Sequence, residues 1–250
     1  MLHYFLASKA TTKLYDRVQP ATHVRKVAVI GGGTMGAGIV VCFLQAKVPV
    51  ILKEINSKML QAGVQRVLDT LHRYIKHSKQ SVTVVETSMR YLHPQTNYDH
   101  FNTVDLVIEA VIEDVALKQK VFQELAQNTQ STTILATNTS TLDIDSIASV
   151  LPDQRRQYVV GAHFFSPAQV MPLLEIVTGV ATGTHVIASM LQVGKVIGKT
   201  SVIAKTCTGF IANRMFMGYA VAATILVLYG IHPYKVDTAL MRFGMPMGVF

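Results

Sequence analysis

The chain has 250 residues, half of them hydrophobic, so it is long enough to bury one large core or two smaller ones. Its formal net charge is +8, but the lysines and arginines are spread along the chain. This distribution argues against a nucleic-acid-binding surface and favours a small polyanionic ligand. Two distant cysteines, Cys42 and Cys207, lie in apolar runs, which is typical of a reducing compartment. We expect neither export nor a bound metal.

Residues 1–24 form an extension that is basic and rich in hydroxyl side chains, with Asp16 as its only acid. This composition fits a mitochondrial targeting segment weakly. The competing interpretation is a linker helix that joins the chain to a preceding region of a longer protein.

Between residues 25 and 206, short β-branched apolar runs alternate with segments of helical period, which is the pattern of a mostly parallel sheet covered by helices. The predicted strands cover residues 26–30, 48–54, 104–110, 132–138, 158–164, 173–177 and 200–204. Apolar spacing predicts a helix over 56–77, and Asp114 is placed to cap another.

After Gly209 the strand pattern stops and only helical pattern remains, so we predict a boundary near this residue. Residues 25–208 then form the first domain, and residues 209–250 form the start of an all-α C-terminal domain. The uncharged stretch 215–231 is at the short limit for a membrane span and contains glycine and threonine, so we expect a buried core helix and no membrane span.

Three glycines follow the first predicted strand as G-x-G-x-x-G, at Gly31, Gly33 and Gly36. After a strand and before a helix, this spacing is typical of a turn that holds a dinucleotide pyrophosphate at the helix N-terminus. Glu54 ends the second predicted strand and is placed to bond the ribose hydroxyls, which favours NAD over NADP. The alternative for Glu54 is a solvated strand end. The predicted fold class is α/β, a Rossmann-type doubly wound sheet.

Polar residues lie at the carboxyl ends of two later predicted strands, where open parallel sheets place their ligands. His163 ends one strand and Glu175 lies on the next, and a histidine oriented by a carboxylate can take a proton from a hydroxyl during its oxidation. For a single histidine, a hydrogen-bonded core position is the competing interpretation. Ser140 follows another strand and either donates to the substrate oxygen or caps the next helix.

Five segments, in this order, carry a resemblance to a known family: "GGGTMGAGI", "VIEAVIED", "LATNTSTL", "GAHFFSPAQVMPLLEIV" and "CTGFIANRM". Together they resemble the L-3-hydroxyacyl-CoA dehydrogenases of fatty-acid β-oxidation, and most of all the dehydrogenase part of plant peroxisomal multifunctional proteins. The segment "YFLASKATTK" resembles the linker helix that precedes this part, which favours the linker interpretation of residues 1–24.

The resemblance implies His163 as general base, Glu175 as its orienting partner, and Ser140 and Asn213 as donors to the reacting oxygen. It also implies NAD as the cofactor, and the residues implied around it are Gly31, Gly33, Met35, Gly36, Glu54, Val111, Ile112, Glu113, Lys118, Ser140 and Ser166. Ser166 replaces an asparagine that is more usual in mitochondrial members. The coenzyme A contacts fall on Thr70 and His77, where His77 stands in place of the family's lysine.

We therefore predict NAD-dependent oxidation of L-3-hydroxyacyl-CoA to 3-oxoacyl-CoA. One alternative is a catalytically weak or silent NAD-binding fragment of a multifunctional protein, because only the beginning of the family's C-terminal domain is present. A second alternative is a hydroxy-acid dehydrogenase of another Rossmann family. The expected partners are an acyl-CoA thioester and either a second copy or the remainder of a multifunctional chain. The resemblance implies a peroxisomal location, with the mitochondrion as the alternative.

Overall fold

The computed structural model describes residue 10, residues 23–78 and residues 83–250. The linker helix predicted within residues 1–24 therefore lies almost wholly outside the described residues. The chain divides into two compact units between Cys207 and Thr208.

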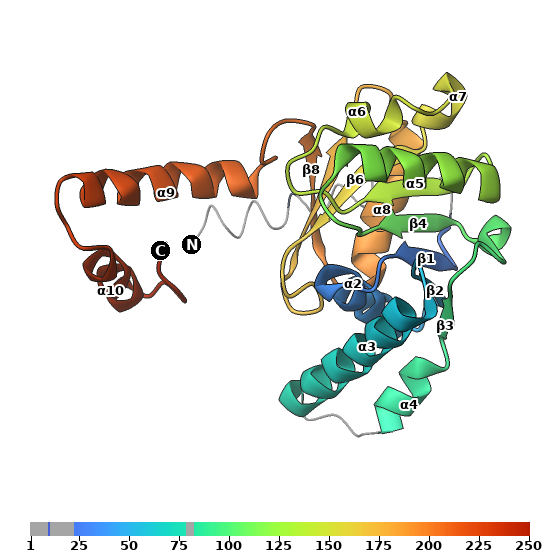
Figure 1. The fold of residues 1–250 in the computed structure, drawn as a ribbon, viewed down its shortest axis with the longest axis horizontal. Helices are drawn as coiled ribbons and strands as arrows, with labels where there is room; N and C mark the ends of the chain where they lie inside the picture. The colour runs from blue at the N-terminus through green and yellow to red at the C-terminus, as the bar shows by residue number, and fades with distance from the viewer. Residues whose placement is uncertain (1–9, 11–22, 79–82) are drawn as a thin grey trace. The chain divides into compact units, whose positions relative to one another are not determined.

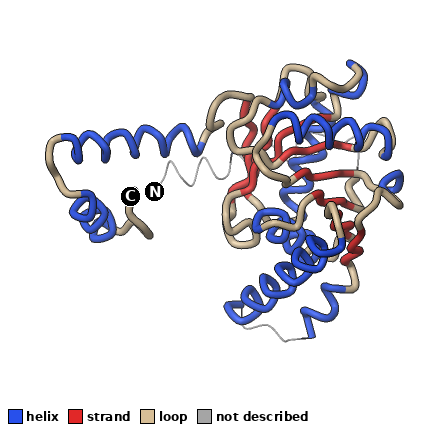
Figure 2. Tube along the Cα trace, in the orientation of Figure 1, coloured by secondary structure: helices blue, strands red, loops and turns tan. Residues whose placement is uncertain are grey.

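The described residues of the first unit form an eight-stranded sheet. Its strands are drawn in red in Figure 2. The strands are β1 Val27–Ile30, β2 Val50–Lys53, β3 Leu92–Gln95, β4 Leu106–Glu109, β5 Ile134–Thr137, β6 Val159–Phe164, β7 Leu173–Thr178 and β8 Thr200–Lys205. Seven of them confirm the strands predicted from the apolar runs. The sequence pattern missed β3, because its "LHPQ" segment contains Pro94, which is tolerated only at a sheet edge, at a bulge or at the first residue of a strand.

The strand order is β3-β2-β1-β4-β5-β6-β7-β8. Every neighbouring pair is parallel except β6 and β7, so the predicted mostly parallel, doubly wound sheet is confirmed. Strand β1 lies between β2 and β4, which is the position where the winding direction reverses. In open α/β sheets, ligands bind in the crevice outside the carboxyl ends of the strands at such a position.

Helices cover both faces of this sheet (Figure 1). They are α2 Thr34–Gln45, α3 Ser57–Ser78, α4 Thr83–Met89, α5 Val115–Asn128, α6 Ile144–Ala148, α7 Asp153–Arg156 and α8 Thr184–Val196, with the short 3-10 helix η1 Phe101–Thr103. Helices α2, α3 and α8 share a hydrophobic core with alternate residues of the strands, such as Val27 and Val29. Helix α5 lies across the sheet from α2 and α3 and buries Val121, Phe122 and Leu125.

Two predicted helix starts have different outcomes. Asp114 accepts a hydrogen bond from the Leu117 amide at 2.7 Å, so the predicted cap of α5 is confirmed. The helix after β5 begins at Ile144 with Asp143 as its cap, so Ser140 is not the cap. The Ser140 side chain is therefore available for another role.

The second unit holds α9 Ala212–Leu228 and α10 Pro233–Phe243, and the predicted helical character after Gly209 is confirmed. The prediction of a buried core helix over 215–231 is wrong, because Ala223 is the one buried residue of α9, whereas Met215 and Leu228 are 74% and 80% exposed. The physical reason is that α10 is the one other helix available to cover α9 within this unit. Among the described residues, no helix combines the length and the apolar character that crossing a membrane requires.

Gly33, which precedes α2, and Gly36, in the first turn of α2, have opposite packing requirements. A Cβ on Gly36 would lie 1.8 Å from the Gly31 carbonyl oxygen, whereas a Cβ on Gly33 would meet no atom within 4 Å. We expect Gly36→Ala to destabilise the fold by about 3 kcal/mol, in the range of core overpacking, and Gly33→Ala to leave the melting temperature nearly unchanged. Thermal unfolding of both variants checks this, and equal losses would contradict the packing argument.

Candidate active site

The turn between β1 and α2 has the features of a site for a phosphate group. Gly31 adopts a positive φ of 95°, and its amide donates to the Lys53 carbonyl at 2.9 Å, which ties the turn to β2. Helix α2 then begins at Thr34, and the first turn of a helix has amide groups without helical acceptors. The open space at Gly33 lies beside these amides.

Glu54 follows β2 and braces this turn. One carboxylate oxygen accepts the Gly32 amide at 2.6 Å, and the other accepts the Ile55 amide at 3.1 Å. The Arg66 guanidinium, from α3, donates to the Gly32 carbonyl at 2.9 Å. The predicted ribose-binding carboxylate thus lies directly against the glycine-rich turn, at the switch point of the sheet.

His163 and Glu175 form a buried pair across two strands. The antiparallel register of β6 and β7 places the two residues directly opposite each other. Nδ1 of His163 lies 2.6 Å from Oε2 of Glu175, the Glu175 side chain is fully buried, and 5% of the His163 side chain is exposed. A neutral imidazole in this contact carries its proton on Nδ1, so that Nε2 is the basic nitrogen.

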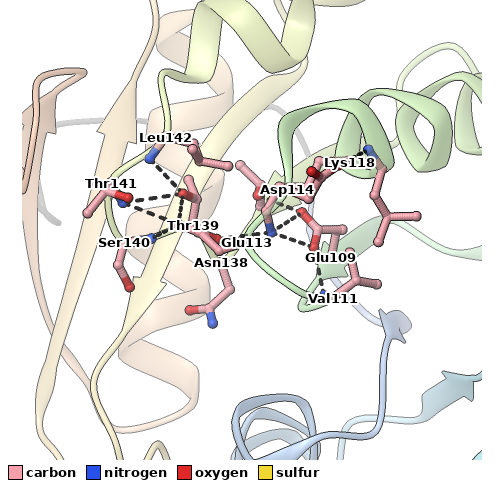
Figure 3. A network of polar contacts seen from close by, with 12 residues as sticks. Glu109, Val111, Glu113, Asp114, Lys118, Asn138, Thr139, Ser140, Thr141 and Leu142 are labelled. Carbon is pink, nitrogen blue, oxygen red and sulfur yellow. Dashed lines mark hydrogen bonds and ion pairs between the residues drawn. The ribbon is translucent and has the colours of Figure 1, made fainter.

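The segment after β5, residues 138–142, carries Ser140 and is called the serine loop below. The Asn138 side chain accepts the Phe164 amide at 2.9 Å, which joins the serine loop to β6 beside His163. The carboxylate of Glu113 accepts the Ser140 amide at 2.8 Å and the Thr141 amide at 3.3 Å, and also accepts the Thr139 hydroxyl. Figure 3 shows these contacts converging on Glu113.

A buried ionic cluster lies behind Glu113. Nζ of Lys118 contacts both carboxylate oxygens of Glu109, at 2.7 and 3.0 Å, and lies 3.4 Å from Glu113. The side chains of Lys118 and Glu109 are fully buried. Glu109 also accepts the Thr137 hydroxyl at 2.6 Å and the Val111 amide at 2.7 Å. The cluster thus joins the ends of β4 and β5 (Figure 3).

Sequence reasoning missed Glu109, Thr137 and Thr139 as members of this arrangement. All three lie in the segments "VIEAVIED" and "LATNTSTL", which carry the family resemblance. Polar residues inside otherwise apolar strand ends were the available signal, because a buried charge needs a partner.

The pKa of Glu113 reflects these contacts. Burial raises the pKa of its carboxyl, but the hydrogen bonds from Thr139 and Ser140 and the charge of Lys118 oppose this, and the net pKa lies below the ordinary glutamate value. The carboxylate is therefore held ionised beneath the serine loop.

The remaining predicted residues fall in three places. Thr70 and Ser166 line a cleft of about 890 Å³ in the first unit, together with Arg73 and Lys199. Met35 packs partly buried against the core, and Ile112 is 73% exposed beside Glu113. Asn213 belongs to α9 in the second unit, and the side chain of His77 lies outside the described residues. The structure thus groups Val111, Glu113, Lys118 and Ser140 in one cluster, and His163 with Glu175 in a second.

A doubly wound sheet, a glycine-rich turn at its switch point and a buried histidine–carboxylate pair define a class of protein, the dinucleotide-binding dehydrogenases. Residues 26–207 match the model of the "3-hydroxyacyl-CoA dehydrogenase, NAD binding domain", and residues 209–250 match that of the "3-hydroxyacyl-CoA dehydrogenase, C-terminal domain". The chain belongs to the 3-hydroxyacyl-CoA dehydrogenase family, and its cofactor class is NAD.

Named relatives agree with this assignment. The chain is 46% identical over 253 aligned residues to the glyoxysomal fatty acid beta-oxidation multifunctional protein MFP-a of Brassica napus, an alignment that covers 100% of this chain and 35% of the relative. Its structure is similar to FadB2 of M. tuberculosis (TM-score 0.86, 31% identity, covering 91% of this chain and 81% of that one). It is also similar to (S)-3-hydroxybutyryl-CoA dehydrogenase PaaH1 of Ralstonia eutropha (TM-score 0.85, 29% identity, covering 90% and 80%). The chain spans about a third of the length of the curated relatives it matches.

The lowered pKa of Glu113 predicts a pH-dependent contribution to stability. This contribution is fully present above the ordinary glutamate pKa of about 4.3 and is lost as the pH falls through the lower pKa of the folded state. Glu113→Gln cannot titrate, so the stability difference between wild type and variant should shrink below about pH 4. Urea unfolding at pH 6 and pH 3 measures it, and a pH-independent difference would contradict the assignment.

Proposed function

We propose that this chain performs NAD-dependent oxidation of L-3-hydroxyacyl-CoA to 3-oxoacyl-CoA, as in fatty-acid β-oxidation. The observation that carries this proposal is the buried contact between His163 and Glu175, near the carboxyl ends of the strands where the dinucleotide crevice opens. The family assignment supplies the substrate class, and the geometry supplies the base.

The residues around the crevice fit NAD. The amides at the start of α2 and the space at Gly33 would hold the pyrophosphate, and Glu54 would bond the ribose hydroxyls and exclude a 2′-phosphate. When bound, the cofactor supplies the acceptor for the substrate's hydride. Met35, Val111, Ile112 and Ser166 are assigned to cofactor contacts on the family's pattern.

In this mechanism His163 accepts the hydroxyl proton of the substrate at Nε2. The carboxylate of Glu175 holds the imidazole in the tautomer that leaves Nε2 basic, and it stabilises the imidazolium that forms. The Ser140 hydroxyl donates to the reacting oxygen, where it also polarises the 3-oxo group in the reverse direction. The role of Asn213 as a second donor to that oxygen rests on the family's pattern.

The cleft lined by Thr70 is suited to the phosphorylated part of coenzyme A. Among the described residues that line it, Arg73 and Lys199 carry positive charge and none is acidic. Nη2 of Arg73 lies 3.4 Å from the Thr70 hydroxyl, so a cation and a hydroxyl are presented together. Arg73 supplies a charge on the same helix as His77, which occupies the family's lysine position.

The peroxisome is the proposed location, because relatives carry peroxisomal and glyoxysomal names, and the mitochondrion is the alternative. The proposed partner is a second copy of the chain or the remainder of a multifunctional chain. One observation favours the second candidate function, a catalytically silent NAD-binding fragment: α9 exposes most of its apolar side chains. Turnover by the purified chain separates the two functions.

Oxidation of NADH with acetoacetyl-CoA tests the proposed function. We expect His163→Gln to lower kcat by roughly 10³-fold, because glutamine can still hydrogen-bond Glu175 but cannot act as a base. Glu175→Gln should lower kcat by roughly 10²-fold, because the imidazolium loses its stabilising charge.

The matched control for this test is His93→Ala, on the exposed edge strand β3, which should leave the rate unchanged. An unaltered rate in His163→Gln would overturn the proposed base. Absence of turnover in the wild-type chain, with NADH binding retained, would favour the silent fragment.

A further inference from the structure

The serine loop is held by one carboxylate oxygen. Oε1 of Glu113 accepts hydrogen bonds from the Thr139 hydroxyl and from the amides of Ser140 and Thr141. Figure 3 shows these donors reaching Glu113 from one side, with Lys118 on its other side. The backbone of Ser140 is therefore located by a side chain from the loop that follows β4, a different part of the chain.

Thr139 also holds the serine loop, through its buried hydroxyl. Its side chain has no exposed area, and its hydroxyl accepts the amides of Leu142 at 2.9 Å and Thr141 at 3.3 Å while donating to Glu113. A single buried hydroxyl thus connects the backbone on the C-terminal side of Ser140 to the carboxylate below it. Removing the hydroxyl leaves backbone amides without their acceptor.

Glu113 is held in turn by the ionic cluster. The Lys118 ammonium is fully buried and contacts both Glu109 and Glu113. Glu109 also accepts a hydrogen bond from the hydroxyl of Thr137, the last residue of β5. Two carboxylates and one ammonium leave a net negative charge, which the donors from the serine loop stabilise. The position of Ser140 is therefore connected to the ends of both β4 and β5.

We propose that Glu113 and Thr139 are positioning residues that set the place of the Ser140 hydroxyl against the substrate's reacting oxygen, with Lys118 and Glu109 as their buried support. This inference rests on the proposed function, because it takes Ser140 as the donor to that oxygen. Glu113 and Lys118, which the family resemblance implies as cofactor contacts, have in this inference the further role of holding the serine loop. Misplacing Ser140 by a fraction of an ångström then lowers kcat and leaves NADH affinity unchanged.

Thr139→Val and Thr133→Val are a matched pair of variants. Both threonines are buried next to opposite ends of β5, and Thr133 donates to the Val104 carbonyl at 3.0 Å, near the start of the strand. We expect similar losses of melting temperature in both, but a roughly 30-fold lower kcat in Thr139→Val alone, with the KM for NADH unchanged. Equal kcat losses, or a raised KM for NADH with normal kcat, would overturn the proposal.

Two variants of Glu113 test the carboxylate. Glu113→Gln keeps an oxygen that can accept from the serine loop, so it should retain most of kcat, whereas Glu113→Ala should lose about as much as Thr139→Val. If Glu113→Ala kept the wild-type kcat, the positioning role would be contradicted.

Amide hydrogen exchange separates this inference from the proposed function, because it needs no substrate. The amides of Ser140 and Thr141 should exchange at least about 10-fold faster in Glu113→Ala, while the Asn138 amide, which donates to the Glu109 carbonyl at 2.8 Å, should be unchanged. Unchanged exchange at Ser140 and Thr141 would overturn the positioning role even in an active enzyme. An inactive wild-type chain with the expected exchange pattern would contradict the function but not the positioning.

Discussion

The site depends on the contact between His163 and Glu175, which in turn depends on the reversal of strand direction between β6 and β7. Residues directly opposite in an antiparallel pair have Cβ atoms about 5 Å apart, so the two side chains meet on one face of the sheet. A Cβ on Gly161 would lie 2.7 Å from that of Val177, so glycine is required for β7 to approach this closely. A fully buried Glu175 without a charged or hydrogen-bonding partner would be strongly destabilising.

The carboxyl ends of the parallel strands are connected to this pair by side chains. Asn138 joins the serine loop to β6 next to His163, and Glu113 joins the same loop to the end of β4. The glycine-rich turn at β1 is joined to β2 through Glu54. The bonds to Glu113 and Glu54 have carboxylate acceptors and are therefore charge-assisted, which makes them shorter and stronger than a neutral bond such as the one to Asn138.

The strands with regular β-branched runs could be predicted from the sequence, because their composition differs from that of the flanking helices. Strand β3 could not, since Pro94 and two polar residues conceal a four-residue edge strand whose parallel partner is β2. Hydrophobicity alone predicted a buried helix over 215–231, but hydrophobicity predicts burial only where a packing partner is present.

In the candidate site, too, some residues could be predicted from the sequence and others could not. Gly33, Glu54 and the facing pair His163 and Glu175 follow from motif spacing and family resemblance. The roles of Glu109 and Thr139 depend on the register between β4 and β5 and on side-chain directions, which a linear pattern does not contain. Residues close to the chemistry were thus easier to identify than those that support them.

The tautomer of His163 is the most direct test of the account. Nitrogen-15 NMR of the imidazole in the neutral state should show a protonated Nδ1, hydrogen-bonded to Glu175, and an unprotonated Nε2. A neutral imidazole protonated at Nε2 would contradict the account, because that nitrogen could not accept the substrate's proton.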